Sequence, residues 1–346
     1  MAVGFPTKVS YANGDVFSAD DINSTNGTIN LLGSSVAYSA GKNVLINGSM
    51  SFWQRGTTSS GNAYLADRWY SALISGTGTF AQESTVVPTG SVYSQKFTVT
   101  AIAQPALYQA VETINAIRYA GQTMTVSAKV AASTSVGFTA DVQYSTSTDN
   151  GVTGTWTSIT ATSGGTATAT STTFVSISGV YAIPSTAKSL RVRLFTTSTI
   201  AIGVVVYFGQ IQLEQGATAT AFQMSTATAA TELAACQRYF YRIGGVTGYN
   251  TFGGAYIVSS TKVAGAVPFP VVMRTTPVAT YTTATNYGFV LTNDTVATAT
   301  GASSDLLTVY NMRMTLNYTT GGLTAGQGCI MLAPNTSSYV DISAEL

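Results

Sequence analysis

Hydrophobic and small polar residues alternate along most of this chain with the period of two that is typical of β-strands. From residue 43 to about residue 224 the alternation recurs in several runs, including Met124, Val126, Ala128 and Val130, and Leu190, Val192 and Leu194. Turn sequences at 75–78, 149–151 and 163–165 separate the runs. Many short strands divided by such turns predict a two-sheet sandwich or jelly roll over residues 43–224.

The pattern changes near residue 225. Helical spacing, at i, i+4, i+7 and i+11, relates Ala229, Leu233, Cys236 and Phe240, and Ser225 precedes them as a candidate N-cap. A linker helix is therefore predicted, although QRYFYRI at 237–243 also reads as the start of a strand. Residues 246–346 again favour strands, so 225–346 is predicted to hold the linker helix and a C-terminal β domain. The overall fold class is all-β.

Residues 1–42 form a third region. Ser18 and Asp21 resemble a capping box, and hydrophobic residues then recur at Ile22, Ile29, Leu32 and Val36. These four residues predict a short helix that bundles with copies of itself. The repeat is shorter than three heptads, so it favours a helix more strongly than an extended coiled coil.

Trp53 lies in a stretch that has two interpretations. Strict alternation over 44–53 would place Trp53 on the more polar face of a strand, where an indole can stack on a sugar ring. The Asn47–Gly48 turn can reset that register, which favours a structural Trp at the end of the sandwich. In the second interpretation Arg55 and Arg68 donate to the backbone or to Asp67.

Composition narrows the classes of partner. Charged residues make up only 8% of the chain, against roughly 25% in ordinary soluble domains, and the net charge is +1. No basic run is present, so nucleic acid is not an expected partner. The longest apolar run, 200–208, is about half the ~20 residues that cross a bilayer, and the start of the chain does not resemble a secretory signal. We therefore expect no membrane insertion.

The chain has no histidine, which removes most catalytic templates. No Ser-His-Asp or Cys-His arrangement can be built, and a zinc site containing histidine is excluded. Cys236 and Cys329 lack metal-ligand spacing, and two free thiols are favoured over a disulfide. No metal or other cofactor is expected.

Glycoside hydrolysis would need two carboxylates roughly 5–9.5 Å apart. No two of the acids in the predicted sandwich form a close motif, and these acids are Asp67, Glu83, Glu112, Asp141, Asp149 and Glu214. Glu112 and Glu214 are interpreted as ion-pair partners of Arg118, Arg191 or Arg193. The sequence therefore predicts no catalytic residues and no enzyme.

A glycine-rich segment at 244–256 carries Tyr249, Phe252 and Tyr256. Glycine frees the backbone and aromatic rings offer contact area, as in adaptable binding loops. A hairpin whose aromatic residues pack between subunits explains the same composition. Together with Trp53, these three residues are the candidate ligand-binding positions.

Several motifs resemble, in their order and spacing, the appendage proteins of tailed bacteriophages. They are NVLINGSMSFWQRGT at 43–57, LADRW at 65–69, AGQTMTVSAKV at 120–130, YFGQIQLEQGATATAFQ at 207–223 and ACQRYFYR at 235–242. The likeness is to tail fibres and receptor-binding proteins that carry a jelly roll like that of carbohydrate-binding modules. It extends more loosely through 267–277 and 341–346, and residues 5–23 resemble the segments that attach such fibres to the particle.

The resemblance implies a homotrimeric fibre or spike, assembled in the host cytoplasm and exposed on the virion. Residues 1–42 would anchor it to other virion proteins, and the distal C-terminal part would face the host and attach to a cell-surface glycan. Three weak sites on one trimer gain avidity when they engage together. The alternative is a purely structural head or collar fibre, decoration protein or adaptor without receptor binding.

Overall fold

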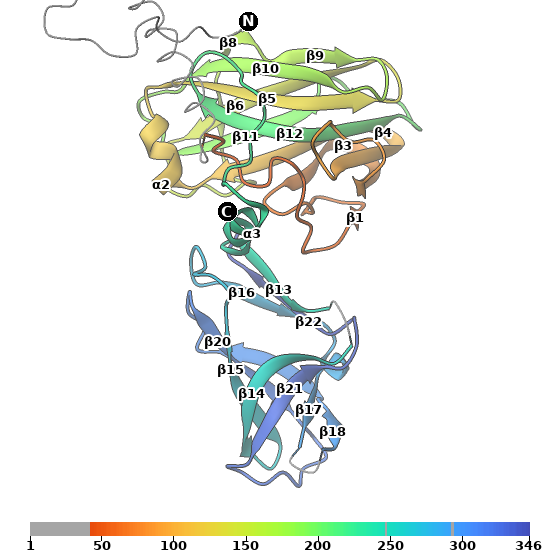
Figure 1. Cartoon of the computed structure of the whole chain (residues 1–346), viewed down its shortest axis with the longest axis vertical. Coiled ribbons are helices and arrows are strands. Elements are labelled where there is room, and N and C mark those ends of the chain that lie inside the picture. Colours follow the sequence, from red (N-terminus) through yellow and green to blue (C-terminus); the bar gives the residue numbers. More distant parts are fainter. Residues whose placement is uncertain (1–41, 246–247, 292–293) are drawn as a thin grey trace, which may run out of the picture.

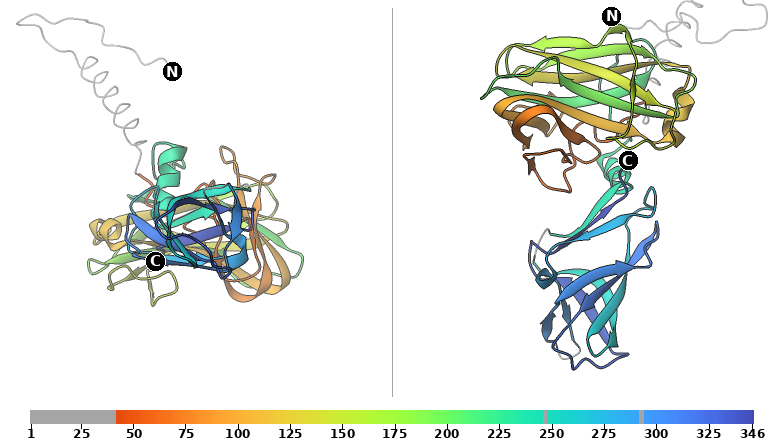
Figure 2. Two further views of the ribbon diagram at one scale, coloured as in Figure 1. Left: turned by 90° about the horizontal axis from the view of Figure 1, so that it is seen from below. Right: turned by 180° about the vertical axis from the view of Figure 1, so that it is seen from behind.

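The computed structural model describes residues 42–245, 248–291 and 294–346, and over these residues the protein is all-β, as the alternation predicts. Two β-rich parts lie one after the other along the longest axis and are joined by one short helix (Figures 1 and 2). The predicted N-terminal helix, with Ile22, Ile29, Leu32 and Val36, lies outside the described residues.

A long antiparallel hairpin organises the first part. Its strands are β3 (Tyr70–Glu83) and β4 (Ser94–Val111). The first half of β4 pairs with β12 (Val205–Gln215), and its second half pairs with β11 (Ser189–Thr196). Because the two halves of β4 pair with different strands, the sheet curls into two facing layers, which form the jelly-roll-like sandwich.

Each layer continues outward from β4 by antiparallel pairing. Beyond β12, the first layer contains β5 (Thr123–Ala132), β10 (Val175–Ala182) and β8 (Ala161–Gly164). Beyond β11, the second layer contains β6 (Val136–Ser145), β7 (Thr157–Ser158) and β9 (Thr166–Ala169). The short strands β1 (Thr58–Ser59) and β2 (Ala63–Tyr64) pair with β3, and a helical turn follows β4 as α2 (Thr113–Ala116) and η1 (Ile117–Tyr119).

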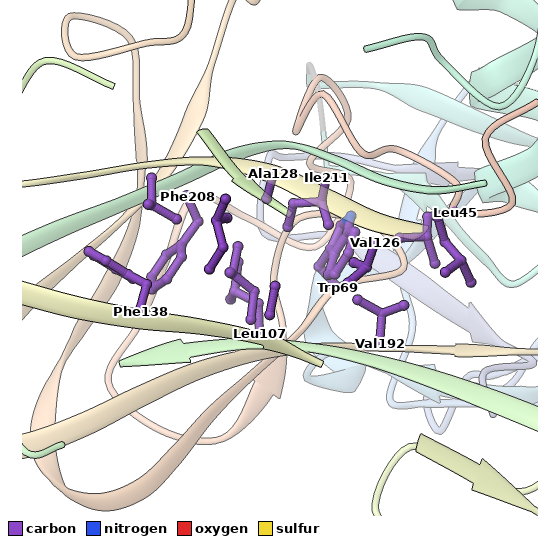
Figure 3. Close-up of a cluster of buried hydrophobic side chains, with 14 of the residues drawn as sticks. Leu45, Trp69, Leu107, Val126, Ala128, Phe138, Val192, Phe208 and Ile211 are labelled. Carbon is purple, nitrogen blue, oxygen red and sulfur yellow. The ribbon is translucent and has the colours of Figure 1, made fainter. Parts of the chain in front are cut away.

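The inward positions of the two layers make the core that the alternation predicts. Phe138 of β6 meets Phe208 of β12 across the sandwich, with ring centroids 5.8 Å apart. Trp69 is fully buried beside Leu107 and Val126 (Figure 3). Burying an aliphatic or aromatic side chain of this size contributes about 1.5–3 kcal/mol, so these contacts hold the layers together.

The stretch 43–56 is not the predicted first strand. Asn47 and Met50 both have φ of 57°, and a turn occupies 46–49. The Asn47 side chain replaces ladder hydrogen bonds: its Oδ1 accepts from the N–H groups of Ser51 and Phe52, and its Nδ2 donates to the carbonyls of Phe52 and Asp67. The main chain also bonds to β12, from the N–H of Val44 to the carbonyl of Leu213 and from the N–H of Ile211 to the carbonyl of Gly48. Period-two alternation fails here because these isolated contacts and the Asn47 side chain replace a regular ladder.

The linker helix α3 runs over Ala229–Gln237 and is capped by Thr228, not by Ser225. Thr228 and Thr231 form a reciprocal capping box, whereas the hydroxyl of Ser225 donates to Glu232. Cys236 is buried but Ala229 is exposed, so only part of the predicted stripe faces the protein. Gln237 ends the helix and Phe240 begins strand β13 (Phe240–Gly244), so the strand interpretation of QRYFYRI holds only for its last four residues.

The second part contains a three-stranded and a seven-stranded antiparallel sheet. In the smaller sheet the strand order is β13, β22 (Tyr339–Ser343) and β16 (Val278–Tyr281). In the larger sheet the strand order is β18 (Val296–Thr298), β17 (Gly288–Val290), β21 (Gly328–Ala333), β14 (Asn250–Ser259), β15 (Lys262–Pro268), β20 (Asn311–Asn317) and β19 (Gly301–Asp305). The 3-10 turn η2 (Ala284–Asn286) precedes β17.

A separate core fills this second part, with Tyr287, Phe289, Met314 and Met331 among its fully buried members. Because β22 pairs with β13, the last residues return to the junction between the two parts (Figure 1).

Candidate functional site

Four strands of the second layer place a row of polar and aromatic side chains on the outer side of the sandwich. The register aligns Tyr70 of β3, Tyr108 of β4, Arg193 of β11 and Asp141 of β6. Their neighbours along the strands point into the core, because side chains of a strand alternate between its faces. The row is therefore a direct product of the register.

Arg193 is fixed within this row by a two-pronged ion pair. Its Nε donates to Oδ1 of Asp141 at 2.9 Å and its Nη2 donates to Oδ2 at 2.5 Å. Its guanidinium also lies 4.9 Å from the ring centroid of Phe195. Burial alone would lower the pKa of Arg193, but the hydrogen bonds and charge of Asp141 raise it. The cation is thus permanently charged and held in one orientation.

A second arginine occupies the adjacent row. The guanidinium of Arg191 lies 4.9 Å from the ring of Tyr108 and 5.1 Å from the ring of Trp156. Its Nε donates to Oε1 of Gln143 at 2.8 Å, and its Nη1 donates to the carbonyl of Val152. Burial, followed by the charge of Arg193, lowers the pKa of Arg191 to about 10. Arg191 therefore braces two aromatic rings.

We call these residues the aromatic strip: Tyr70, Tyr108, Asp141, Arg191, Arg193, Phe195 and Trp156. All four of its aromatic residues are half-buried, so each ring is held in place and still has accessible surface. Flat apolar rings suit the faces of pyranose sugars, and a few fixed polar groups supply orientation. The strip has the chemistry of a saccharide-binding face.

The sequence does not predict this strip. From the sequence, Arg191 and Arg193 are expected only as ion-pair partners of Glu112 or Glu214. The signal was present, because the alternation that sends Val192 and Leu194 inward sends both arginines outward. What the sequence lacks is the register, which sets Tyr108 and Asp141 on either side of Arg193.

The four predicted ligand-binding residues do not form one site. Tyr249 and Tyr256 are 68% and 46% exposed on the second part, but Phe252 is only 5% exposed. A β-bulge between Thr251 and Gly253 turns the Phe252 ring into the core, 5.8 Å from that of Tyr287. Phe252 is therefore a core residue and is not available for stacking.

Trp53 lies at the junction, on the sandwich side. Its indole N–H donates to the carbonyl of Met50 at 2.6 Å, and its ring packs partly against the sandwich core. This agrees with a structural role at the end of the sandwich. One side of the ring also lines a groove between the two parts.

Residues from the sequence motifs at 43–57, 65–69 and 235–242 meet at the same junction between the two parts. The guanidinium of Arg55 lies 3.6 Å from the ring centroid of Phe240, and that of Arg68 lies 3.5 Å from the ring centroid of Tyr239. Both guanidinium groups bind the carboxylate of Glu345, Arg55 through a 2.8 Å contact to Oε1 and Arg68 through Oε2. The two expected contacts are present as well: Arg68 donates to the carbonyl of Ala110, and Arg55 lies 3.7 Å from Asp67.

Asp67 is a buried acid within this junction. It is 1% exposed, and it accepts hydrogen bonds from the backbone N–H and the side-chain amide of Gln54. Burial raises the pKa of Asp67 to about 6, although Arg55 opposes the shift. A raised pKa is typical of catalytic acids. Here the carboxylate is shielded from solvent and held by Gln54, and it contributes to the contacts at the junction.

The remaining predicted ion pairs have other partners. Glu112 binds Arg238 at 3.2 Å, and Glu214 binds Lys42 at 3.1 Å, so the expected pairing with Arg118, Arg191 or Arg193 is wrong. Lys42 directly precedes the sandwich sequence and Arg238 directly follows the helix α3, so neither acid pairs with a basic residue on a neighbouring strand. Cys236 and Cys329 are free thiols, as expected.

Among residues 42–245, 248–291 and 294–346, no group of three or more metal-ligating side chains could hold an ion. No helix in those ranges is long and apolar enough to cross a membrane.

Comparison with known proteins finds no matching family model and no matching curated protein. Several solved structures are similar to part of the chain. One is the C-terminal family 22 carbohydrate-binding module of Clostridium thermocellum Xyn10B, which is 17% identical in sequence. The match covers 44% of this chain and 89% of that module, with a TM-score of 0.33. A family 61 module in complex with β-1,4-galactotriose gives 11% identity, coverages of 50% and 99%, and a TM-score of 0.33.

A viral structure also overlaps with the chain. It is the enzymatically active domain of bacteriophage CBA120 tailspike protein 4, with 12% identity, coverages of 51% and 22%, and a TM-score of 0.32. TM-scores this low do not define a shared fold, so the jelly-roll-like description rests on the strand pairing of this chain.

Proposed function

We propose that this protein is a fibre or spike subunit of a tailed phage and that it attaches to a host-surface glycan through the aromatic strip. The observation that carries the proposal is the row Tyr70, Tyr108, Arg193 and Asp141, which is held half-exposed across four strands. Rigid rings beside oriented charged groups bind sugars without any chemical step. The proposed activity is binding and not hydrolysis.

The junction supports the fibre role. The phage-like motifs at 43–57, 65–69, 235–242 and 341–346 are far apart in sequence, yet they meet in one cluster of arginine, aromatic and carboxylate groups. Such a cluster fixes the second part on the first, which a shaft or spike needs. We propose that three copies assemble, that residues 1–42 anchor them to other virion proteins, and that the assembled protein is exposed on the virion.

A purely structural role is the second candidate. Tyr256, Val258 and Ile330 expose apolar surface on neighbouring strands of the larger sheet of the second part. Exposed apolar residues on one sheet face are typical of contacts between subunits. A head or collar fibre, decoration protein or adaptor would use them for assembly alone, with no receptor.

Glycan binding by the full chain separates the two roles. We expect the wild-type protein to bind host-surface polysaccharide on an array, and Tyr108→Ala to lose most of that binding. Tyr310→Ala is the matched control, because Tyr310 is exposed in the second part and far from the strip in the fold. Failure of the wild-type protein to bind any host glycan would favour the structural role.

A further inference from the structure

A groove of about 560 Å³ lies at the junction, on the side of Trp53. It falls within the roughly 300–1,000 Å³ of small-molecule sites, which form preferentially at interfaces between domains. Four segments line it: the loop that begins at Trp53, the helix α3, and the strands β13 and β14. Its lining includes Trp53, Gln54, Leu233, Gln237, Tyr241 and Ile243.

Trp53 and Tyr241 line this groove together with the amide residues Gln54, Gln237 and Asn250. The amide of Gln237 and the hydroxyl of Tyr241 make no hydrogen bond within the described residues, and Oε1 of Gln54 accepts none there. The amide nitrogen of Gln54 is held by Asp67 and by the carbonyl of Phe240 at 3.0 Å, which fixes the direction of Oε1. The groove thus offers oriented donors and acceptors beside flat apolar surface.

The lining has no uncompensated charge. Among the described residues that line it, Arg242 alone is charged, and Asp341 holds the guanidinium through contacts of 2.6 Å at Nε and 2.8 Å at Nη2. A charged ligand would find no free counter-ion and would lose its hydration. A neutral ligand rich in hydroxyl groups fits this combination of rings and amides.

The backbone beside the groove is shaped by two consecutive glycines. Gly244 and Gly245 have φ of 85° and 78°, which other residues rarely adopt. A Cβ at Gly244 would lie 2.4 Å from the carbonyl oxygen of Ser338. The close packing against Ser338 and the positive φ values therefore require glycine at this edge of the groove.

We propose that the junction groove is a second saccharide site, specific for a neutral mono- or disaccharide unit, with Trp53 as the stacking surface and Gln54, Gln237 and Tyr241 as the hydrogen-bonding groups. The inference rests on the proposed function, because a fibre that binds glycans would meet the same polymer at both places. It is nevertheless a separate site, built from different residues.

The three tryptophans allow the two sites to be measured apart. Trp53 lies in the groove, Trp156 in the strip, and Trp69 is fully buried. In a Trp156→Phe variant of the full chain, changes in emission on adding sugar report on Trp53. In Trp53→Phe they report on Trp156. Trp156→Tyr replaces the first variant if it does not fold, as judged by circular dichroism.

The probes are maltose, lactose and cellobiose, with glucose and glucuronate as a neutral and charged pair. We expect at least one disaccharide to shift Trp53 emission with a dissociation constant on the order of 1 mM, or about −4 kcal/mol. Gln237→Ala or Tyr241→Phe should weaken that constant roughly three- to tenfold, as the loss of one hydrogen bond does. Glucuronate should bind more weakly than glucose.

Three results would overturn the inference: no shift of Trp53 emission up to about 50 mM of any probe, far above the expected constant, a shift unchanged by both substitutions, or tighter binding of glucuronate than of glucose. The failure of the proposed function looks different. In that case Trp156 emission would not respond to host polysaccharide, whatever Trp53 does.

Discussion

Arg68 of the sandwich lies over the ring of Tyr239 of the second part, with its guanidinium carbon 3.5 Å from the ring centroid. Only 2% of Arg68 is exposed, and the carboxylate of Glu345 neutralises its charge. Burial would lower the pKa of Arg68, but Glu345 and the neighbouring tyrosines raise it above its usual range. The joint between the two parts is therefore made from a buried cation, its counter-ion and an aromatic ring.

We expect Glu345→Gln to weaken this joint strongly. It removes the anion shared by Arg55 and Arg68 and leaves both cations in a nearly dry environment. Breaking a buried pair costs about 3–5 kcal/mol, which denaturant unfolding followed by far-ultraviolet circular dichroism would measure. Asp305→Asn is the control, since its pair with Arg313 is exposed and should change stability little. Equal losses for both substitutions would contradict the assignment of the joint.

The pKa of Asp67 predicts how stability depends on pH. Its folded value of about 6 exceeds its usual value near 4, so the folded protein binds the proton more tightly than the unfolded chain does. The contribution of Asp67 to stability is fully present below pH 4 and is lost as pH rises through about 6. Between pH 7 and pH 5 we expect a gain on the order of 1 kcal/mol.

The control for this effect is Asp67→Asn, which should abolish most of the change between pH 7 and pH 5 in urea unfolding. Glu83 does not interfere in that window. Burial alone would raise its pKa, but hydrogen bonds from Lys96 and from the backbone of Thr85 bring it to about 2, so its contribution is lost only at much lower pH. An unchanged pH dependence in Asp67→Asn would assign the effect to another group.

Asn47 should be among the most sensitive positions of the sandwich. Asn47→Ala removes four side-chain hydrogen bonds and places alanine at a φ of 57°. Each buried polar group left without a partner costs about 1–3 kcal/mol, so we expect a loss above roughly 3 kcal/mol. Asn47→Gly relieves the backbone only and should recover a small part of the loss. Recovery of full stability by glycine would mean that the side chain contributes nothing.

The aromatic strip predicts a difference between arginine and lysine. Arg193→Lys keeps the charge but loses the two-pronged contact with Asp141. We expect glycan affinity to fall about tenfold, equal to about 1.4 kcal/mol, while the unfolding midpoint changes little. Lys188→Arg, at the end of the same sheet, serves as the control substitution. Unchanged affinity in Arg193→Lys would remove Arg193 from the binding face.

The hydrophobic pattern of the sequence predicts which strand residues are buried, because that depends only on alternation along each strand. The inward residues Met124, Val126, Leu190 and Val192 are all buried, because each strand exposes alternate side chains to one core. Phe240 fitted both the helical stripe and a strand in the sequence, and the structure places it at the start of β13.

Contacts between residues that are distant in the sequence could not be predicted in the same way. Arg55 and Glu345 are 290 positions apart, and the sequence around either residue does not indicate that the other is its partner. The bulge that buries Phe252 depends on the pairing of β14 with β21. The strip likewise needs the register of four strands, so its residues become a site only in the folded protein.

The most direct test of the proposed function is to map where a glycan touches the full chain. A photoactivatable derivative of host polysaccharide, cross-linked to the protein and located by mass spectrometry of the peptides, would do so. The strip predicts cross-links within β4, β6 and β11, around Tyr108, Asp141 and Arg193, and their loss in Tyr108→Ala. Cross-links confined to the exposed face around Tyr256, or none above background, would contradict glycan binding by the strip.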